Sequence, residues 1–166
     1  MFRTSVLLLG LAIGAFAQAK VAIINSQASV IETAELKKAQ AELEAKYKPR
    51  TAQIEAIQKE LAQIQQSLQA GQGKLTPQAE QDLNIRGQRK QREAQRLSED
   101  LQAEVDRERN DILGRSSQRM QEVVKKMAEE RGYDVVVDVS NTIYYKPGLE
   151  ITKEATAAYD QAYPSK

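Results

Sequence analysis

The stretch IEAIQKELAQIQQSLQAGQGKLTP, residues 54–77, decides the fold. Its larger apolar side chains recur alternately three and four residues apart, a narrow stripe separated by Gln, Ala, Glu and Lys that is typical of coiled-coil helices. Gly71 suits a helix C-terminus, and Thr76 with Pro77 suits the N-cap and first turn of a second helix. A connection this short predicts an antiparallel helical hairpin. The stripe residues are Ile54, Ile57, Leu61, Ile64 and Leu68.

The same spacing runs back to Leu36, so the first helix should begin near Thr33. Pro49 interrupts it, and proline is poorly tolerated inside a helix. We therefore expect a short helix to about Lys46, a bend, and then a longer helix. The second helix should run from Pro77 to about Arg131 and end at Gly132.

Folding the hairpin about the middle of its loop predicts the pairing of the two helices. On this count Ile64 faces Leu83, and Tyr47 faces Leu101. Elsewhere the match is poor, because apolar positions of the first helix face a basic strip on the second. This predicts a loosely packed outer arm, although the Lys and Arg stems could simply cover the apolar stripe.

The remaining segments predict a small β body, formed by residues 20–32 and 132–166, from which the arm of residues 33–131 projects. Residues 21–24 form an apolar run that suits a buried strand. Residues 135–137 and 142–145 flank a short polar loop and are interpreted as a β-hairpin. Thr152 should cap a last helix reaching Tyr159.

Such a small sheet cannot bury enough apolar surface to stand alone, and its strand edges would be open. We therefore expect the body to be shared among identical copies. A monomer whose helices fold back over the sheet is the alternative.

The first nineteen residues, MFRTSVLLLGLAIGAFAQA, have the pattern of a secretory signal peptide: an early Arg, an apolar stretch and small residues before the cleavage site. Two A-x-A sites are present. We favour cleavage after Ala19, and cleavage after Ala17 remains open. The mature chain, residues 20–166, is then a single exported domain.

The composition argues against an enzyme. The 166 residues include no His and no Cys, which excludes an imidazole base, a thiolate nucleophile, a Cys/His zinc site and a disulfide. No phosphate-binding glycine loop is found, so we expect no catalytic residue, no cofactor and no metal. With a formal net charge of +1, and no aromatic residues within the basic run at 86–92, we also expect no nucleic-acid partner.

Several segments in order resemble the Skp/OmpH family of periplasmic chaperones over essentially the whole mature chain. They are KVAIIN at 20–25, KAQAELE at 38–44, GYDVVVD at 132–138, IYY at 143–145 and EIT at 150–152. The resemblance implies an α+β homotrimer of jellyfish shape, similar to prefoldin, with a barrel-like β body and three helical tentacles around a cavity. It implies ATP-independent holding of unfolded outer-membrane proteins in the periplasm.

On this reading the outer arm binds clients and the strands assemble the body. A structural coiled-coil protein that spaces or tethers envelope layers is the alternative function, and contact with a membrane is left open. The predicted client-binding residues are Ile54, Ile57, Leu61, Ile64, Leu68, Leu75, Leu83, Ile85, Arg86, Arg89, Lys90 and Arg92, and the predicted oligomer interface comprises Val21, Ile23, Val135, Val137, Ile143 and Tyr144.

Overall fold

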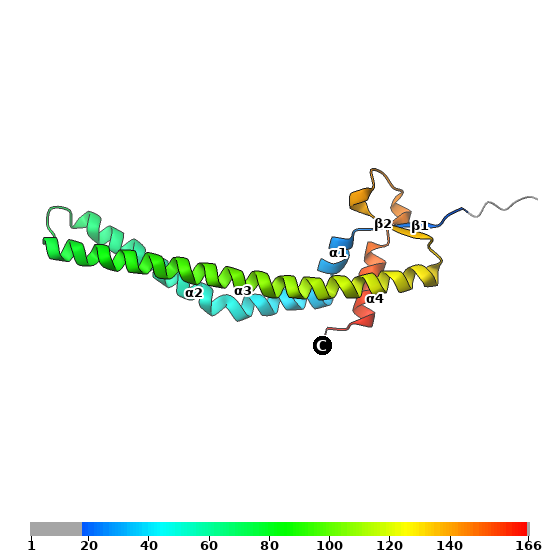
Figure 1. The fold of residues 1–166 in the computed structure, drawn as a ribbon, viewed down its shortest axis with the longest axis horizontal. Coiled ribbons are helices and arrows are strands. Elements are labelled where there is room, and N and C mark those ends of the chain that lie inside the picture. The colour runs from blue at the N-terminus through cyan, green and yellow to red at the C-terminus, as the bar shows by residue number, and fades with distance from the viewer. Residues whose placement is uncertain (1–17, 166) are drawn as a thin grey trace, which may run out of the picture.

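A computed structural model describes residues 18–165. Two long helices form a slender arm, and the short elements gather at one end of it (Figure 1). The predicted signal peptide lies almost entirely outside the described residues. In chain order the elements are β1 (Val21–Ile24), α1 (Ser26–Ile31), α2 (Ala34–Ala70), α3 (Pro77–Arg131), β2 (Val135–Asp138), two 3-10 turns (Val139–Asn141 and Pro147–Leu149) and α4 (Thr152–Ala162).

The hairpin and its boundaries are confirmed. The Thr33 hydroxyl caps α2 by accepting from the Leu36 N–H at 3.3 Å, and Thr76 caps α3 by accepting from the Ala79 N–H at 3.2 Å. Gly132 ends α3 in the left-handed conformation, at a φ of 64°. With 55 residues, α3 is about 80 Å long at the usual helical rise.

The predicted break at Pro49 is wrong, because α2 continues through it as one helix of 37 residues. A proline removes one backbone hydrogen bond, the one that the carbonyl of Ala45 would accept. Ala45 is exposed, so water can satisfy that carbonyl. The buried side chains of Tyr47 and Ile54 hold the helix against α3 on either side of the proline. Figure 1 shows α2 curving across α3 rather than breaking.

The predicted register is also wrong. Ile64 lies against Gly87, which is one turn beyond Leu83. A Cβ added to Gly87 would sit 3.5 Å from the Cγ2 atom of Ile64. Farther down the arm, Tyr47 lies beside Glu108 rather than Leu101. The cause is the loop, in which the Leu75 N–H donates to the Gly71 carbonyl at 2.9 Å. This extra turn stays wound on the end of α2, so the chain folds back near Thr76 and not at mid-loop.

The sheet has two parallel strands, with Val21 opposite Val135 and Ile24 opposite Asp138. The predicted hairpin of residues 135–145 is therefore wrong: residues 139–141 form a 3-10 turn, and residues 142–146 form no strand. The Asp138 carboxylate accepts from the Ser140 N–H at 2.8 Å and the Ser26 N–H at 3.0 Å. These bonds wind the chain tightly after β2 and fasten it to the start of α1, which the sequence did not predict.

Thr152 begins α4 but does not cap it, because the N-cap position is Ile151. The Thr152 hydroxyl instead accepts from the Asn25 N–H at 2.9 Å and so joins α4 to the end of β1.

The core lies where the sheet, α1 and α4 meet the C-terminal part of α3. The sequence alone assigns the whole of α3 to the arm. β2 contributes only the partly buried Val136. The buried side chains come from β1, α1, α4 with its N-cap residue, and the last third of α3. They are Ala22, Ile24, Val30, Met120, Val123, Met127, Ile151, Ala155 and Tyr159.

Candidate functional site

The apolar side chains predicted on the arm fall into two groups. Ile54, Ile57 and Ile64 are buried in the seam between α2 and α3, with 5–9% of their surface exposed. Ile85 is 41% exposed, and the remaining leucines are half-buried. The first group already contacts the other helix, so only the second offers surface to another molecule. The half-buried leucines are Leu61, Leu68, Leu75 and Leu83.

The predicted basic strip is divided in the same way. Glu60 of α2 lies 3.9 Å from Arg86 and 3.3 Å from Lys90, and Glu93 lies 3.3 Å from Lys90. Hydrogen bonding to these two carboxylates raises the pKa of Lys90. Arg89 and Arg92 are exposed and pair with no carboxylate among residues 18–165.

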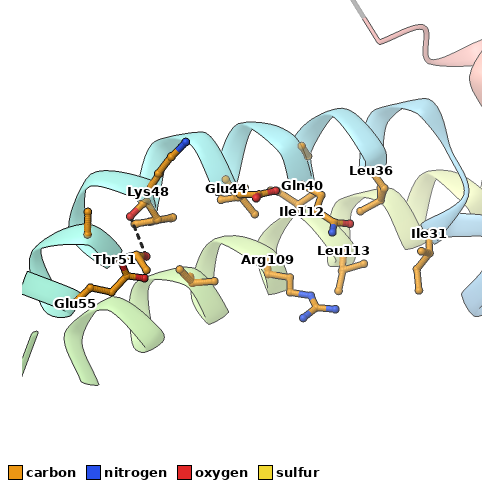
Figure 2. Close-up of a pocket in the computed structure, with 15 residues that line it drawn as sticks. Ile31, Leu36, Gln40, Glu44, Lys48, Thr51, Glu55, Arg109, Ile112 and Leu113 are labelled. Carbon is orange, nitrogen blue, oxygen red and sulfur yellow. Dashed lines mark hydrogen bonds between the residues drawn. The ribbon is translucent and has the colours of Figure 1, made fainter. Parts of the chain in front are cut away.

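The inner half of the arm contains an apolar groove that the sequence analysis missed. It lies between α2 and α3, next to the body, and has a volume of about 660 Å³ (Figure 2). Leu36, Leu43 and Ile112 contribute apolar surface, and acidic and basic side chains both line it. The groove exists because Ala39 and Gln40 are too small or too polar to fill the space between the helices. The polar Gln40 at a stripe position was the available signal. The charged lining residues are Glu44, Lys48, Glu55 and Arg109.

Tyr47 also lines this groove, and its hydroxyl oxygen is buried without a hydrogen-bond partner among the described residues. Burial, and then the neighbouring carboxylate of Glu108, raises the pKa of Tyr47. The phenol is therefore neutral at physiological pH and adds no charge to the groove.

The predicted interface residues surround an open strand edge. On one side β1 pairs with β2, and on the other side it makes a single parallel bridge between Ile23 and Glu150. The outer edge of β2 therefore pairs with none of residues 18–165. Val135 on that strand is 44% exposed. Ile143 is fully exposed and Tyr144 is 80% exposed on the segment that follows β2. Ile23 is buried within the body, and Val21 and Val137 are half-buried.

Over residues 18–165, no cluster of three or more acidic, His or Cys side chains is placed to hold a metal ion. None of the described helices combines the length and apolarity that crossing a bilayer requires.

A long helical hairpin on a small two-stranded body is the architecture of one protein family, and the sequence identifies that family. The sequence pattern of the family described as "Outer membrane protein (OmpH-like)" matches residues 20–159, and the chain belongs to this Skp/OmpH family. The family is one of chaperones and not of enzymes.

Individual relatives agree with this assignment. The chain is 30% identical to the "Chaperone protein Skp" of Yersinia enterocolitica, over 88% of this chain and 91% of the relative. It is 22% identical to the "Skp-like protein" of Pseudomonas aeruginosa, over 89% of this chain and 88% of the relative. An OmpH-like protein of Caulobacter crescentus, solved by crystallography, shares the fold with a TM-score of 0.69 at 21% identity, covering 90% of this chain and 89% of that one.

Proposed function

We propose that this protein is an ATP-independent holdase of the periplasm, which binds unfolded outer-membrane or envelope proteins and keeps them from aggregating. The observation that carries the proposal is the arm. It extends far beyond the core, and it presents partly exposed apolar side chains next to unpaired arginines. Membership of a chaperone family supports it.

Client capture would rest on many weak contacts. Each apolar contact gains about 25 cal/mol per Å² removed from water, so several small contacts hold a chain reversibly without any chemical step. The exposed Ile85 and the half-buried leucines are available at once. Ile54, Ile57 and Ile64 would take part only where α2 and α3 separate. Arg86, Arg89, Lys90 and Arg92 would add electrostatic attraction, chiefly through the two that are unpaired.

We propose that three copies assemble through their bodies, so that three arms surround a cavity. The open edge of β2 supplies unpaired backbone groups, which an extended segment of another copy can satisfy. Ile143 and Tyr144 supply apolar surface beside it. Val21, Ile23, Val135 and Val137 complete the proposed interface.

Light scattering of an unfolded β-barrel protein diluted into buffer tests the holdase. An equimolar amount of the trimer should suppress the rise in scattering. Unchanged scattering would contradict the proposal and favour the alternative, a coiled-coil tether that binds one fixed partner and has no effect on aggregation.

The mass in solution tests the assembly. The wild-type protein should elute from a size-exclusion column with the light-scattering mass of three chains. I143D should lower that mass, whereas I85D, which places the same charge on an exposed isoleucine of the arm, should not. A well-folded wild-type monomer at micromolar concentration would contradict the trimer.

The division of the basic strip gives a sharper test than removing all four charges. R89E/R92E should weaken client capture at low salt, because these arginines have no carboxylate partner. R86E/K90E is the matched control, and it should weaken capture less, since Glu60 and Glu93 already neutralise those residues. Equal capture by wild type and R89E/R92E would show that the strip is only a solvated face. Neither variant should change the oligomeric state.

A further inference from the structure

The first residue of the predicted mature chain is tied to the start of β2. The main-chain N–H of Lys20 donates to the Asp134 carboxylate at 2.6 Å, and the Asp134 N–H donates to the Lys20 carbonyl at 2.8 Å. This reciprocal pair stands immediately before the first register pair of the sheet, Val21 with Val135. It therefore closes the end of the sheet at which the chain enters the body.

The side chain of Lys20 reaches the same corner. Its Nζ donates to the carbonyl of Arg131 at 2.5 Å and lies 5.1 Å from the centre of the Tyr133 ring. Arg131 is the last residue of α3, and a cation at a helix C-terminus interacts favourably with the carbonyls that the helix leaves unpaired. Lys20 thus joins β1, β2 and the end of α3.

The chain before Lys20 contributes nothing comparable. Gln18 and Ala19 are exposed and make no hydrogen bond with other described residues. The contacts that hold the chain to the body therefore begin at Lys20, directly after the second of the two A-x-A sequences.

We propose that processing occurs at the Ala19–Lys20 bond and that it turns the Lys20 nitrogen into an ammonium that clamps Asp134. A signal peptidase would hydrolyse this amide with one water, leaving a carboxylate on Ala19 and an amine on Lys20, which takes up a proton near neutral pH. The hydrogen bond from a neutral amide to the Asp134 carboxylate becomes one between two opposite charges, and it gains their mutual attraction, which salt screens. The inference rests on the export contained in the proposed function. It distinguishes the two sites, because cleavage after Ala17 would put the charge on the unattached Gln18.

The test has two parts, both separate from the holdase assay. The intact mass of the full chain, exported in a bacterial host and purified, should correspond to a start at Lys20. Two forms are then produced with defined first residues, one beginning at Lys20 and one at Gln18, each with and without D134N. At low salt the Lys20 form should melt about 1–4 °C higher than the Gln18 form. D134N or 1 M salt should remove most of that difference.

Amide hydrogen exchange at Val21 and Val135 supplies a local measurement, in case melting of the long arm hides the effect. Exchange there should be about two- to five-fold slower in the Lys20 form than in the Gln18 form. An exported protein that begins at Gln18, equal melting and exchange of the two forms, or a difference that survives D134N unchanged would each overturn the clamp. Loss of client binding in these variants has no bearing on it, so the two proposals fail separately.

Discussion

The body and the outer arm share the long helix α3 but are stabilised very differently. In the body, Ala22, Ala155 and Tyr159 are fully enclosed by segments from both ends of the chain. In the outer arm, beyond Pro49, the buried hydrophobic side chains are Ile54, Ile57 and Ile64 of α2, and they contact a single neighbouring helix. Helical stability in proteins comes mostly from packing. The smaller number of packing partners therefore indicates that the outer arm is adaptable, whereas the body is rigid.

The largest effect is expected at Tyr159. Its side chain is completely buried, and its hydroxyl donates to Glu35, which also accepts from Arg119 at 2.9 Å. Y159A should destabilise the protein by about 3–5 kcal/mol, because it leaves a cavity at the junction of α2, α3 and α4. Thermal denaturation followed by circular dichroism measures this loss.

I64A is the matched substitution in the arm, at a residue with 5% exposure. It should speed hydrogen exchange in the outer arm and leave exchange in the body unchanged, because the arm can open without the core. If I64A lowered protection throughout the body, the contrast between the two regions would be wrong.

The second effect concerns Pro49, which interrupts the hydrogen bonding of α2 without breaking the helix. P49A should restore one backbone bond and stabilise the inner arm by about 1–3 kcal/mol. Slower amide exchange at residues 45–53, measured by mass spectrometry, would show it. Faster exchange would mean that the curvature set by the proline is needed for packing against α3.

The same proline shows what the sequence could and could not predict. The hairpin, its caps and the end of α3 were predictable, because Thr33, Thr76 and Gly132 act through local geometry that the sequence states directly. The continuity of α2 was not, since it depends on whether side chains on both sides of Pro49 find partners across the seam. The register failed for a similar reason, because one turn hidden in the loop moves every pairing along α3.

The body was less predictable than the arm for a physical reason. Residues 142–145 have the composition of a strand, but the bonds made by Asp138 fold the chain into a 3-10 turn before them. The inner groove was missed because the polar Gln40 stands at a stripe position between Leu36 and Leu43 and, with the small Ala39 beside it, leaves the space between the helices unfilled. Among the client-binding candidates, the sequence could not separate buried isoleucines from exposed residues without the correct register.

The third effect is acid sensitivity at Asp138. Its hydrogen bonds from Ser140 and Ser26 hold the pKa of this carboxyl well below its usual range. Because the folded pKa is depressed, the stabilisation is present above the unfolded pKa of about 3.9 and is lost as pH falls below it. D138N should therefore melt below wild type at pH 7, and the gap should close progressively between about pH 5 and pH 2. A gap that stayed constant over this range would mean that the variant acts through shape and not through charge.

The smallest effects compare two glycines, one in each region. Gly132 has a φ of 64°, so G132A forces a side chain into the left-handed region and should cost about 1 kcal/mol. Gly87 lies inside α3, and a Cβ there would meet Ile64 Cγ2 at an ordinary 3.5 Å. G87A should therefore stabilise the arm by about 0.5–1 kcal/mol. Urea denaturation of both variants gives the two values, and opposite signs are expected because the helix end needs glycine whereas the seam only tolerates it. Destabilisation by G87A would show that α2 and α3 approach more closely at this point than the 3.5 Å contact allows, and the outer arm would then be tighter than its few buried residues indicate.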